Sequence, residues 1–390
     1  MNPHVKEQPP AHPTELSELS GQSLTQLTVL VSYSGSGGVE VITNHLVAGM
    51  LNAGVKIELL LLKTRGPHFS KLPEHPNLTI RKLKASSAWL AVPELKRYCN
   101  DHPGRVLMAI KDRAIQAASL ANYLSGCKVR VVGQLHTNMQ TGLAGRIKVL
   151  VRVRFKMMRY LYRYLAGVIA VSQDAADSLQ SIVQLSPEKV TVLANPVITP
   201  DIEVKSQMEP VHPWLADKSQ CVIVAAGRLS SQKNFALLIR AFKLVLQKKV
   251  AKLVILGEGP QRSQLEALCS ELALTDDVSL FGFVDNPYAE MKHADLFVLS
   301  SDCEGSPTVL TECLSLGIPC VATAVGDVTE TLQDGRIGPV VPCNNEEALA
   351  AAIIHTLDGP PASDRLKQAV HKFRQAESVA AYLKQLARWQ

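Results

Sequence analysis

The sequence predicts an α/β protein with two doubly wound domains, each a parallel sheet between helices. Short apolar segments alternate with helical segments twice along the chain, and a proline-rich stretch separates the two series. The first series opens with strand 27–32, a glycine turn, helix 39–52 and strand 55–62, which is the order of a right-handed βαβ unit. The 390 residues are too many for one ordinary core and are sufficient for two.

Further strands are predicted wherever short, β-branched apolar runs recur. In the first series these are 106–110, 129–133 and 167–171. In the second series strands are expected at 221–226, 252–256, 278–281, 295–299 and 320–323, with helices at 235–247, 262–272 and 308–316. The alternation of strand and helix thus restarts near residue 221.

The predicted domain boundaries follow from this alternation. A stretch with four prolines and mixed charges separates the two series. We therefore divide the chain into a leader without regular structure (1–24), an amino-terminal Rossmann-like domain (25–198), a linker (199–218), a carboxyl-terminal Rossmann-like domain (219–370) and a final helix (371–390) that could pack back on the first domain.

Composition narrows the class of protein. Hydrophobic residues make up 46% and charged residues 19%, so the chain can bury sizeable cores, and the formal net charge of +6 is only mildly basic. No run approaches the roughly 20 apolar residues of a spanning helix, and residues 1–20 lack a signal-type apolar stretch. None of the eight cysteines forms a C-x-x-C pair, so reduced thiols of a cytoplasmic protein are expected.

One phrase of the second series carries most of the functional signal. An apolar strand runs into a polar loop that ends in Glu304, and Ser306 and Pro307 suit the N-cap and the first position of the helix that follows. Such a helix start offers free N–H groups at the carboxyl edge of the sheet, where doubly wound folds bind ligands. Glu312 follows eight residues later, inside the helix, so one carboxylate is expected at the mouth of a cleft and one deeper.

A second phrase, GRLSSQKN, follows the first strand of the same domain. It places Arg228 and Lys233 at a strand end. A nucleotide-diphosphate leaving group gains charge in the transition state, and such cations can stabilise it without a metal ion.

The segment EGSPTVLTECLSLGIP, with GRLSSQKN before it, resembles the retaining glycosyltransferases of the GT-B fold, family four. Their signature holds two glutamates separated by seven residues, here Glu304 and Glu312. The resemblance covers most of 27–357 and is strongest after residue 221. Two departures, Ser306 where many members have phenylalanine and Asn195–Pro196 where many have Asn-Gly, concern the choice of donor sugar.

The resemblance implies roles for individual residues. Catalytic roles are expected for His136, beside the transferred sugar, and for Glu304. Donor-binding roles are expected for Gly37, Gly38, Arg228, Lys233, Glu258, Phe283, Val284, Gly305, Ser306, Pro307, Thr308, Val309 and Glu312.

The glycine turn 35–38 admits another interpretation, a Rossmann dinucleotide loop. The third glycine of G-x-G-x-x-G is replaced by Glu40, so binding of a nicotinamide cofactor is a weaker interpretation than donor binding.

The predicted function is that of a retaining, metal-independent hexosyltransferase. The chain contains no Asp-x-Asp motif of the kind that holds a divalent ion in other nucleotide-sugar enzymes, so no metal and no cofactor are expected. The expected partners are a nucleotide-sugar donor, most simply a UDP-sugar, and a cell-envelope glycan or glycolipid acceptor such as lipopolysaccharide. A nucleotide-sugar epimerase of the same architecture and a catalytically silent nucleotide-sugar-binding scaffold remain as alternatives.

Residues 146–163 carry seven basic side chains and no acidic one. On a helix, one face would hold Lys148, Arg152, Lys156, Arg159 and Arg163, whereas Arg154 would intrude on the apolar side. An ordinary helix packed on its domain explains the pattern. A positive face against the inner surface of the cytoplasmic membrane or an anionic acceptor explains it equally. No aromatic stacking platform accompanies the charges, which argues against nucleic acid.

Overall fold

The structure is a computed structural model that describes residues 24–33, 38–66, 68–136, 139, 148–217 and 219–390. Predictions that concern Gly37 and almost all of the leader lie outside the described residues, as does the side chain of Lys148.

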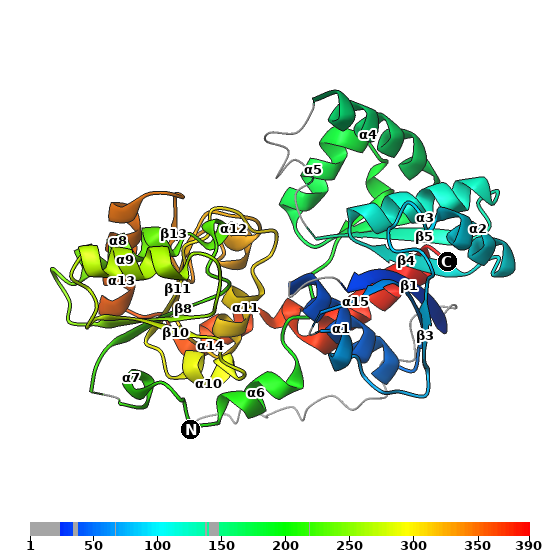
Figure 1. The fold of residues 1–390 in the computed structure, drawn as a ribbon. Helices are drawn as coiled ribbons and strands as arrows, with labels where there is room; N and C mark the ends of the chain where they lie inside the picture. The colour runs from blue at the N-terminus through cyan, green and yellow to red at the C-terminus, as the bar shows by residue number, and fades with distance from the viewer. Residues whose placement is uncertain (1–23, 34–37, 67, 137–138, 140–147, 218) are drawn as a thin grey trace, which may run out of the picture.

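Two parallel sheets, one in each lobe, organise the described part of the chain (Figure 1). The first has the strand order β3-β2-β1-β4-β5-β6-β7 and the second β10-β9-β8-β11-β12-β13. The predicted fold class, two doubly wound α/β sheets, is confirmed. The strands of the first sheet are β1 Gln26–Tyr33, β2 Lys56–Thr64, β3 Leu78–Lys82, β4 Val106–Ile110, β5 Arg130–Leu135, β6 Gly167–Ala170 and β7 Val190–Val192. Those of the second are β8 Val222–Ala226, β9 Lys252–Leu256, β10 Val278–Gly282, β11 Leu296–Leu299, β12 Cys320–Thr323 and β13 Val340–Val341.

Helices cover both faces of each sheet, because parallel strands need crossovers and their apolar side chains point to both sides. The first sheet packs α1 and α15 on one face and α2 to α5 on the other. The second packs α8, α9 and α13 on one face and α10, α11 and α14 on the other. The helices are α1 Gly38–Asn52, α2 Val92–Asp101, α3 Asp112–Leu124, α4 Lys148–Leu161, α5 Gln173–Val183, α6 Pro200–Ser206, α7 Pro213–Ala216, α8 Phe235–Val245, α9 Arg262–Glu271, α10 Pro287–Lys292, α11 Thr308–Ser315, α12 Val328–Thr331, α13 Glu346–Asp358, α14 Ser363–Ala369 and α15 Gln375–Arg388.

The strand order fixes where ligands can bind. In each sheet the chain reverses its direction of growth beside the first strand, between β1 and β4 and between β8 and β11. At such a switch point the loops after the two strands diverge and leave a crevice at the carboxyl edge. Both predicted site regions follow strands that flank these two points.

The chain crosses between the lobes twice, and the two crossings run side by side. Ile198 forms a parallel bridge with Arg374, and Ser378 donates a hydrogen bond of 2.6 Å to the carbonyl of Ala194. Beyond this crossing α15 lies against α1 in the first lobe, where Tyr382 is fully buried and accepts a hydrogen bond of 2.9 Å from Gln134 (Figure 1).

Several features differ from the sequence expectations, and the short strands β7 and β13 were missed along with β3. The edge strand β3 was missed because four of its five side chains are exposed and no apolar run marks it. The segment 199–218, predicted as a linker, contains α6 and α7, which each begin at a proline and bury Ile202 and Leu215 against the second sheet. Helix α11 begins at Thr308, with Pro307 rather than Ser306 at the N-cap.

Candidate functional site

Lys233 and Glu304 form the centre of the candidate site in the second lobe. The loops after β8 and β11 bring them together across the switch point, and the Lys233 ammonium lies 2.6 Å from Glu304 Oε1. The Ser301 hydroxyl donates to the same oxygen at 3.0 Å. Both charged side chains are largely buried, with 18% and 13% of their surfaces exposed, so the pair interacts in a medium less polar than water.

Hydrogen bonds between the two loops hold this pair in place. Asn234 caps α8 through its Oδ1 and donates from Nδ2 to Asp302 at 2.9 Å. Gln232 reaches back to the carbonyl of Cys303, and the amide of Asp302 donates to the carbonyl of Gln232. The lysine and the glutamate are therefore positioned by a rigid double loop, which favours a preorganised charge arrangement.

Arg228 lies in the same loop but has a different environment. Its side chain is exposed and forms no ion pair or hydrogen bond with a described residue. Its guanidinium at the carboxyl edge of the second sheet is therefore available to an anion.

Two glycines allow the loops after β8 and β9 to touch. Gly257 has φ +138°, and a Cβ there would lie 2.0 Å from the carbonyl oxygen of Gly227. A Cβ on Gly259 would lie 2.3 Å from the carbonyl oxygen of Leu229. Only glycine fits such backbone approaches.

Glu258, between these glycines, is engaged elsewhere. Arg262 binds its carboxylate in a bidentate manner, at 2.6 Å and 2.9 Å. The predicted contact of the Glu258 side chain with a donor would require this pair to open.

Glu312 lies on α11, apart from the Lys233–Glu304 pair. Tyr288 of α10 donates a hydrogen bond of 3.3 Å to its Oε1. Burial raises the pKa of Glu312 to about 7, and the hydrogen bond from Tyr288 opposes that rise. A carboxylate in such a setting can exchange its partner for ligand hydroxyls.

The start of α11 is packed against the loop after β12. Gly305 accepts a hydrogen bond from the amide of Asp327 at 3.2 Å, and a Cβ on Gly326 would lie 2.4 Å from the Gly305 carbonyl oxygen. Burial raises the pKa of Asp327 to about 7, while a hydrogen bond with Ser306 lowers it. The predicted cap role of Ser306 is thus wrong, because its side chain pairs with Asp327. The first N–H groups of α11, at Thr308 and Val309, have no partners within the helix.

Phe283 and Val284 border a cavity of about 370 Å³ between the loop after β10 and residues 208–211. The Phe283 side chain is 76% exposed, whereas Val284 packs on the core. A flat, exposed aromatic ring beside a cavity of this size suits contact with a planar ligand group.

The first lobe contributes a second polar cluster at its own switch point. Lys111 follows β4 and lies 3.3 Å from Glu40 of α1, next to Gly38 at the start of that helix. His136 follows β5 and is buried, and its Nε2 has no hydrogen-bond partner among the described residues. Burial, and then the nearby charge of Lys111, lower the pKa of His136 to about 3, so the imidazole is neutral.

Sequence reasoning missed Lys111, Tyr288 and Asp327. Lys111 directly follows an apolar strand, the same signal that identified Arg228, and it has φ +74°, a conformation uncommon outside glycine. Asp327 lies in the loop after β12, the strand that follows Glu304 along the chain. No local pattern marks Tyr288, which reaches Glu312 only through the packing of α10 on α11.

A charge of the first lobe influences a residue of the second lobe across the carboxyl edges of the two sheets. Partial burial, and then the negative charges of Glu304 and of Asp174 at the start of α5, raise the pKa of Cys303. Asp174 belongs to the first lobe and Cys303 to the second. Among the described residues, no group of three or more His, Cys, Asp or Glu side chains is placed to hold a metal ion.

Two family models match the chain. Residues 211–373 match "Glycosyl transferases group 1" and residues 36–199 match "Glycosyltransferase Family 4". The two matches leave only the ends of the chain and residues 200–210 uncovered.

Individual relatives agree with the families. The chain is 28% identical over 358 residues, 89% of this chain and 93% of the relative, to the N-acetylgalactosamine-N,N'-diacetylbacillosaminyl-diphospho-undecaprenol 4-alpha-N-acetylgalactosaminyltransferase of Campylobacter jejuni. It is 33% identical to an uncharacterized glycosyltransferase of Methanocaldococcus jannaschii, of which it covers only 41%.

Solved structures show the same fold. The lipopolysaccharide outer core galactosyltransferase WaaB has a TM-score of 0.71 at 17% identity, with 92% of this chain and 99% of that chain covered. Anabaena HepE in complex with UDP has a TM-score of 0.67 at 18% identity, with 93% and 97% covered. These likenesses show the GT-B fold, and the two family matches show that the chain belongs to the glycosyl transferases of group 1.

Proposed function

We propose that this glycosyltransferase moves a sugar from a UDP-sugar to a cell-envelope glycan or glycolipid acceptor, with retention of configuration and without a metal ion. The observation that carries the proposal is the Lys233–Glu304 pair with the exposed guanidinium of Arg228 beside it, at the carboxyl edge of the second sheet. Two cations, Lys233 held by Glu304 and Arg228 exposed, can neutralise the charge that develops on a leaving diphosphate, which is the task a metal ion performs in other enzymes.

The remaining residues take the roles that their environments suit. Glu304, already held by Lys233 and Ser301, faces the donor sugar. The first N–H groups of α11 contact phosphate or sugar oxygens. Glu312 exchanges its hydrogen bond with Tyr288 for ribose hydroxyls, and Phe283 and Val284 contact the base.

The first lobe would supply the acceptor side. The neutral His136 orients the transferred sugar through a hydrogen bond, since its unpaired Nε2 can donate or accept without charge. We expect attack from the face on which the leaving group departs. Relatives support the envelope acceptor: the names of two of them refer to a diphospho-undecaprenol-linked substrate and to the lipopolysaccharide core.

The test is a donor screen by nucleotide release, with and without EDTA. Slow hydrolysis of one UDP-sugar is expected to be resistant to EDTA and to be abolished by Glu304→Ala. Loss of release in EDTA would contradict metal independence. Conversion of the donor to another nucleotide sugar would identify an epimerase, and nucleotide-diphosphate binding without any release would identify a silent nucleotide-sugar-binding scaffold. Absence of both release and binding would contradict the proposed donor site.

We place the protein in the cytoplasm, at the inner face of the membrane, with α4 as its contact. None of the helices in the described ranges is long and apolar enough to cross a bilayer. The predicted apolar side, with Arg154 intruding on it, agrees with the structure, but the exposed face of α4 is not purely basic. Met158 and Leu161 are buried, and Arg154 turns inward to pair with Asp112.

The outer face of α4 is both cationic and apolar. Arg152, Lys156 and Arg159 are exposed there, but so are Val153 and Tyr160 at 59% and 44%. Tyr160 also belongs to a surface cluster with Tyr123 and Tyr164, whose ring centroids lie 5.1–5.8 Å apart. The expectation that no aromatic platform accompanies the charges is therefore wrong, because α3, α4 and the turn after α4 bring these rings together. Cations beside exposed aromatic rings are typical of surfaces that bind the interface of an anionic bilayer.

Neutralising Arg152 and Lys156 together with glutamine is expected to weaken binding to vesicles that contain anionic lipid about 30-fold, at about 1 kcal/mol per charge. Vesicle co-sedimentation measures this. Lys96→Gln with Arg97→Gln, an equal change of charge on the exposed face of α2, is the control. Equal binding of the first variant and the wild type, or binding that ignores anionic lipid, would refute the contact.

A further inference from the structure

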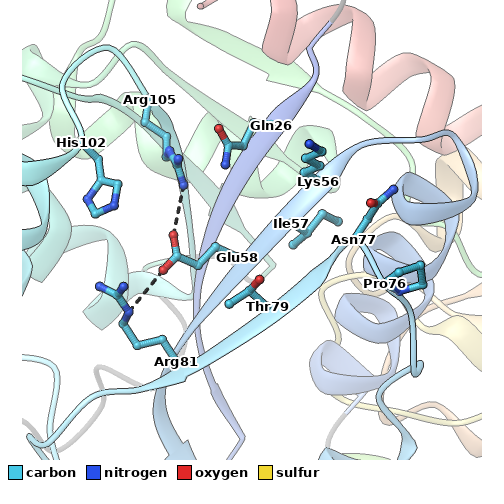
Figure 2. Close-up of a pocket in the computed structure, with 10 residues that line it drawn as sticks. All are labelled: Gln26, Lys56, Ile57, Glu58, Pro76, Asn77, Thr79, Arg81, His102 and Arg105. Carbon is cyan, nitrogen blue, oxygen red and sulfur yellow. Dashed lines mark hydrogen bonds and ion pairs between the residues drawn. The ribbon is translucent and has the colours of Figure 1, made fainter.

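The first lobe has a polar cavity at the amino edge of its sheet, opposite the carboxyl edge that holds Lys111 and His136. Its volume is about 430 Å³, and Figure 2 shows the residues that line it. They come from the first residues of β1 and β2, from β3 and the segment before it, and from the segment before β4. Arg105 of this cavity directly precedes β4 and Lys111 directly follows it, six residues further along the strand direction, so the carboxyl edge with Lys111 and His136 lies about 20 Å away. The cavity is therefore distinct from the proposed active site.

Strand register gathers the polar side chains of this cavity on one face. Gln26 pairs with Lys56, and Glu58 pairs with Thr79. Since alternate residues of a strand point to the same side, Lys56 and Glu58 share a face, as do Thr79 and Arg81. An acidic residue at position 58 is unusual here, because the strand continues with four buried leucines.

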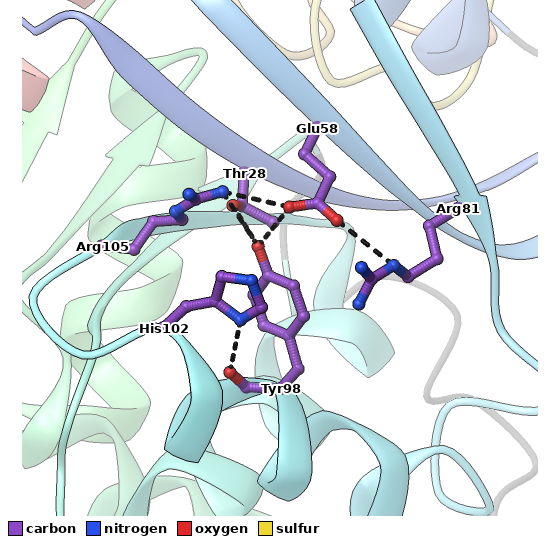
Figure 3. Close-up of polar contacts among 6 residues, drawn as sticks. All are labelled: Thr28, Glu58, Arg81, Tyr98, His102 and Arg105. Atoms are coloured by element: carbon purple, nitrogen blue, oxygen red, sulfur yellow. Dashed lines mark hydrogen bonds and ion pairs between the residues drawn. The ribbon is translucent and has the colours of Figure 1, made fainter.

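The charge of Glu58 is already satisfied within the protein. Arg105 donates to its Oε2 at 3.0 Å, Tyr98 donates to the same oxygen at 2.7 Å, and Arg81 reaches Oε1 at 3.3 Å (Figure 3). Thr28 hydrogen-bonds the Tyr98 hydroxyl in turn. Buried carboxylates require this kind of pairing. Glu58 therefore serves to orient two guanidinium groups, and it does not repel an incoming anion as a free carboxylate would.

Positive charge remains in excess. Arg105 alone would balance Glu58, and it is only 18% exposed. Arg81 uses Nε for Glu58 and its guanidinium lies 5.7 Å from the centroid of the Tyr98 ring, but its two terminal nitrogens have no hydrogen-bond or ion-pair partner among the described residues. Lys56 likewise forms no ion pair with a described residue. With three cations and one carboxylate, the lining carries a formal charge of +2, apart from His102. Side-chain amides of Gln26 and Asn77 and the Thr79 hydroxyl complete it.

We infer that this cavity binds a phosphate monoester of a small polyol or sugar. A phosphate monoester carries a charge of −1.5 to −2 at neutral pH, which matches the excess of two cations, whereas a single carboxylate would leave one of them unbalanced. Guanidinium forks suit phosphate oxygens, and neutral amides and a hydroxyl suit the hydroxyl groups of the ligand. The volume lies within the range of small-ligand sites.

Calorimetry with glycerol 3-phosphate, inorganic phosphate and glycerol tests the inference. The proposed donor site also attracts phosphate, so the titrations use the full-length Arg228→Gln/Lys233→Met variant. Binding of glycerol 3-phosphate is expected to persist in this background, and glycerol is expected not to bind. Adding Lys56→Gln and Arg81→Gln should weaken the affinity at least tenfold, because two of the three cations of the lining are lost while Arg105 and Tyr98 still hold Glu58.

The matched control adds Lys96→Gln and Arg97→Gln, which lower the net charge equally on the same lobe, and should leave the affinity within about twofold. The inference is overturned if glycerol 3-phosphate does not bind, if the control pair weakens binding as much as the cavity pair, or if binding disappears with Arg228 and Lys233. Thermal unfolding of each variant separates loss of the site from loss of the fold.

Discussion

Replacing Lys233 with methionine is expected to lower kcat/KM for glycosyl transfer about 10²–10³-fold, the usual consequence of removing one preorganised group that stabilises transition-state charge. The Lys233 ammonium lies 2.6 Å from Glu304 and on the edge where a diphosphate would leave. Methionine keeps the length of the side chain and removes the charge. Arg228 would remain as the only cation of the two, at an exposed position where water screens its field.

Lys248→Met is the matched control for this substitution. Lys248 is exposed just beyond the carboxyl end of α8, so the variant changes the net charge equally but leaves the carboxyl edge intact. Its kcat/KM should equal that of the wild type. A loss of less than tenfold in Lys233→Met, with a folded protein, would show that Lys233 is structural.

A double-mutant cycle with Glu304→Gln shows whether Lys233 and Glu304 act as a unit or act separately on the leaving group and the sugar. Among the residues that the structure describes, removing Lys233 leaves Glu304 with the Ser301 hydroxyl alone, so part of the loss comes from a carboxylate without its cation. If the double variant is little worse than the worse single variant, the two residues act as a unit. Strict additivity would mean that they act separately on leaving group and sugar.

Much of the fold could be predicted because its strands are buried on both faces. Strands such as β4 and β9 appear in the sequence as continuous apolar runs that end in a polar loop. The same pattern located Arg228, Lys233 and Glu304, since side chains directly after such strands gather at one edge. The edge strand β3 and the two-residue β13 have no such run, and only pairing with a neighbour defines them.

The parts of the site that escaped prediction depend on contacts between distant segments. Tyr288 and Glu312 are 24 positions apart and meet because α10 packs on α11. The bidentate ion pair between Glu258 and Arg262 depends on the path of the loop after β9. The polar cavity at the amino edge of the first sheet depends on the register between β1, β2 and β3, which brings Lys56, Thr79 and Gln26 together. Sequence spacing alone does not specify such cross-strand neighbours.

Gly257→Ala is the other substitution with a large expected effect, a loss of about 4 kcal/mol or more of stability in the second lobe. Two costs add. The φ of +138° is a conformation that L side chains rarely adopt, and the new Cβ would lie 2.0 Å from the carbonyl oxygen of Gly227. That oxygen belongs to backbone, which cannot rotate away as a flexible side chain can.

Gly54→Ala separates these two costs. Gly54 also has positive φ, +86°, but a Cβ there would meet nothing within 4 Å. It should therefore lose only the conformational part, about 1–2 kcal/mol. Thermal unfolding should show a fall of about 10 °C for Gly257→Ala and about 4 °C for Gly54→Ala. Equal shifts would mean that the contact between the two loops relaxes without cost.

The functional consequence of Gly257→Ala follows from the same contact. The backbone that must move carries Gly227 and leads directly to Arg228 and Lys233, so the cations would shift from the carboxyl edge. Binding of UDP should weaken in Gly257→Ala well before the lobe unfolds, and it should be unchanged in Gly54→Ala. A stable Gly257→Ala protein with normal UDP affinity would show that the loop after β9 does not position the cations. Positioning would then rest on Asn234, Gln232 and their bonds to the loop after β11.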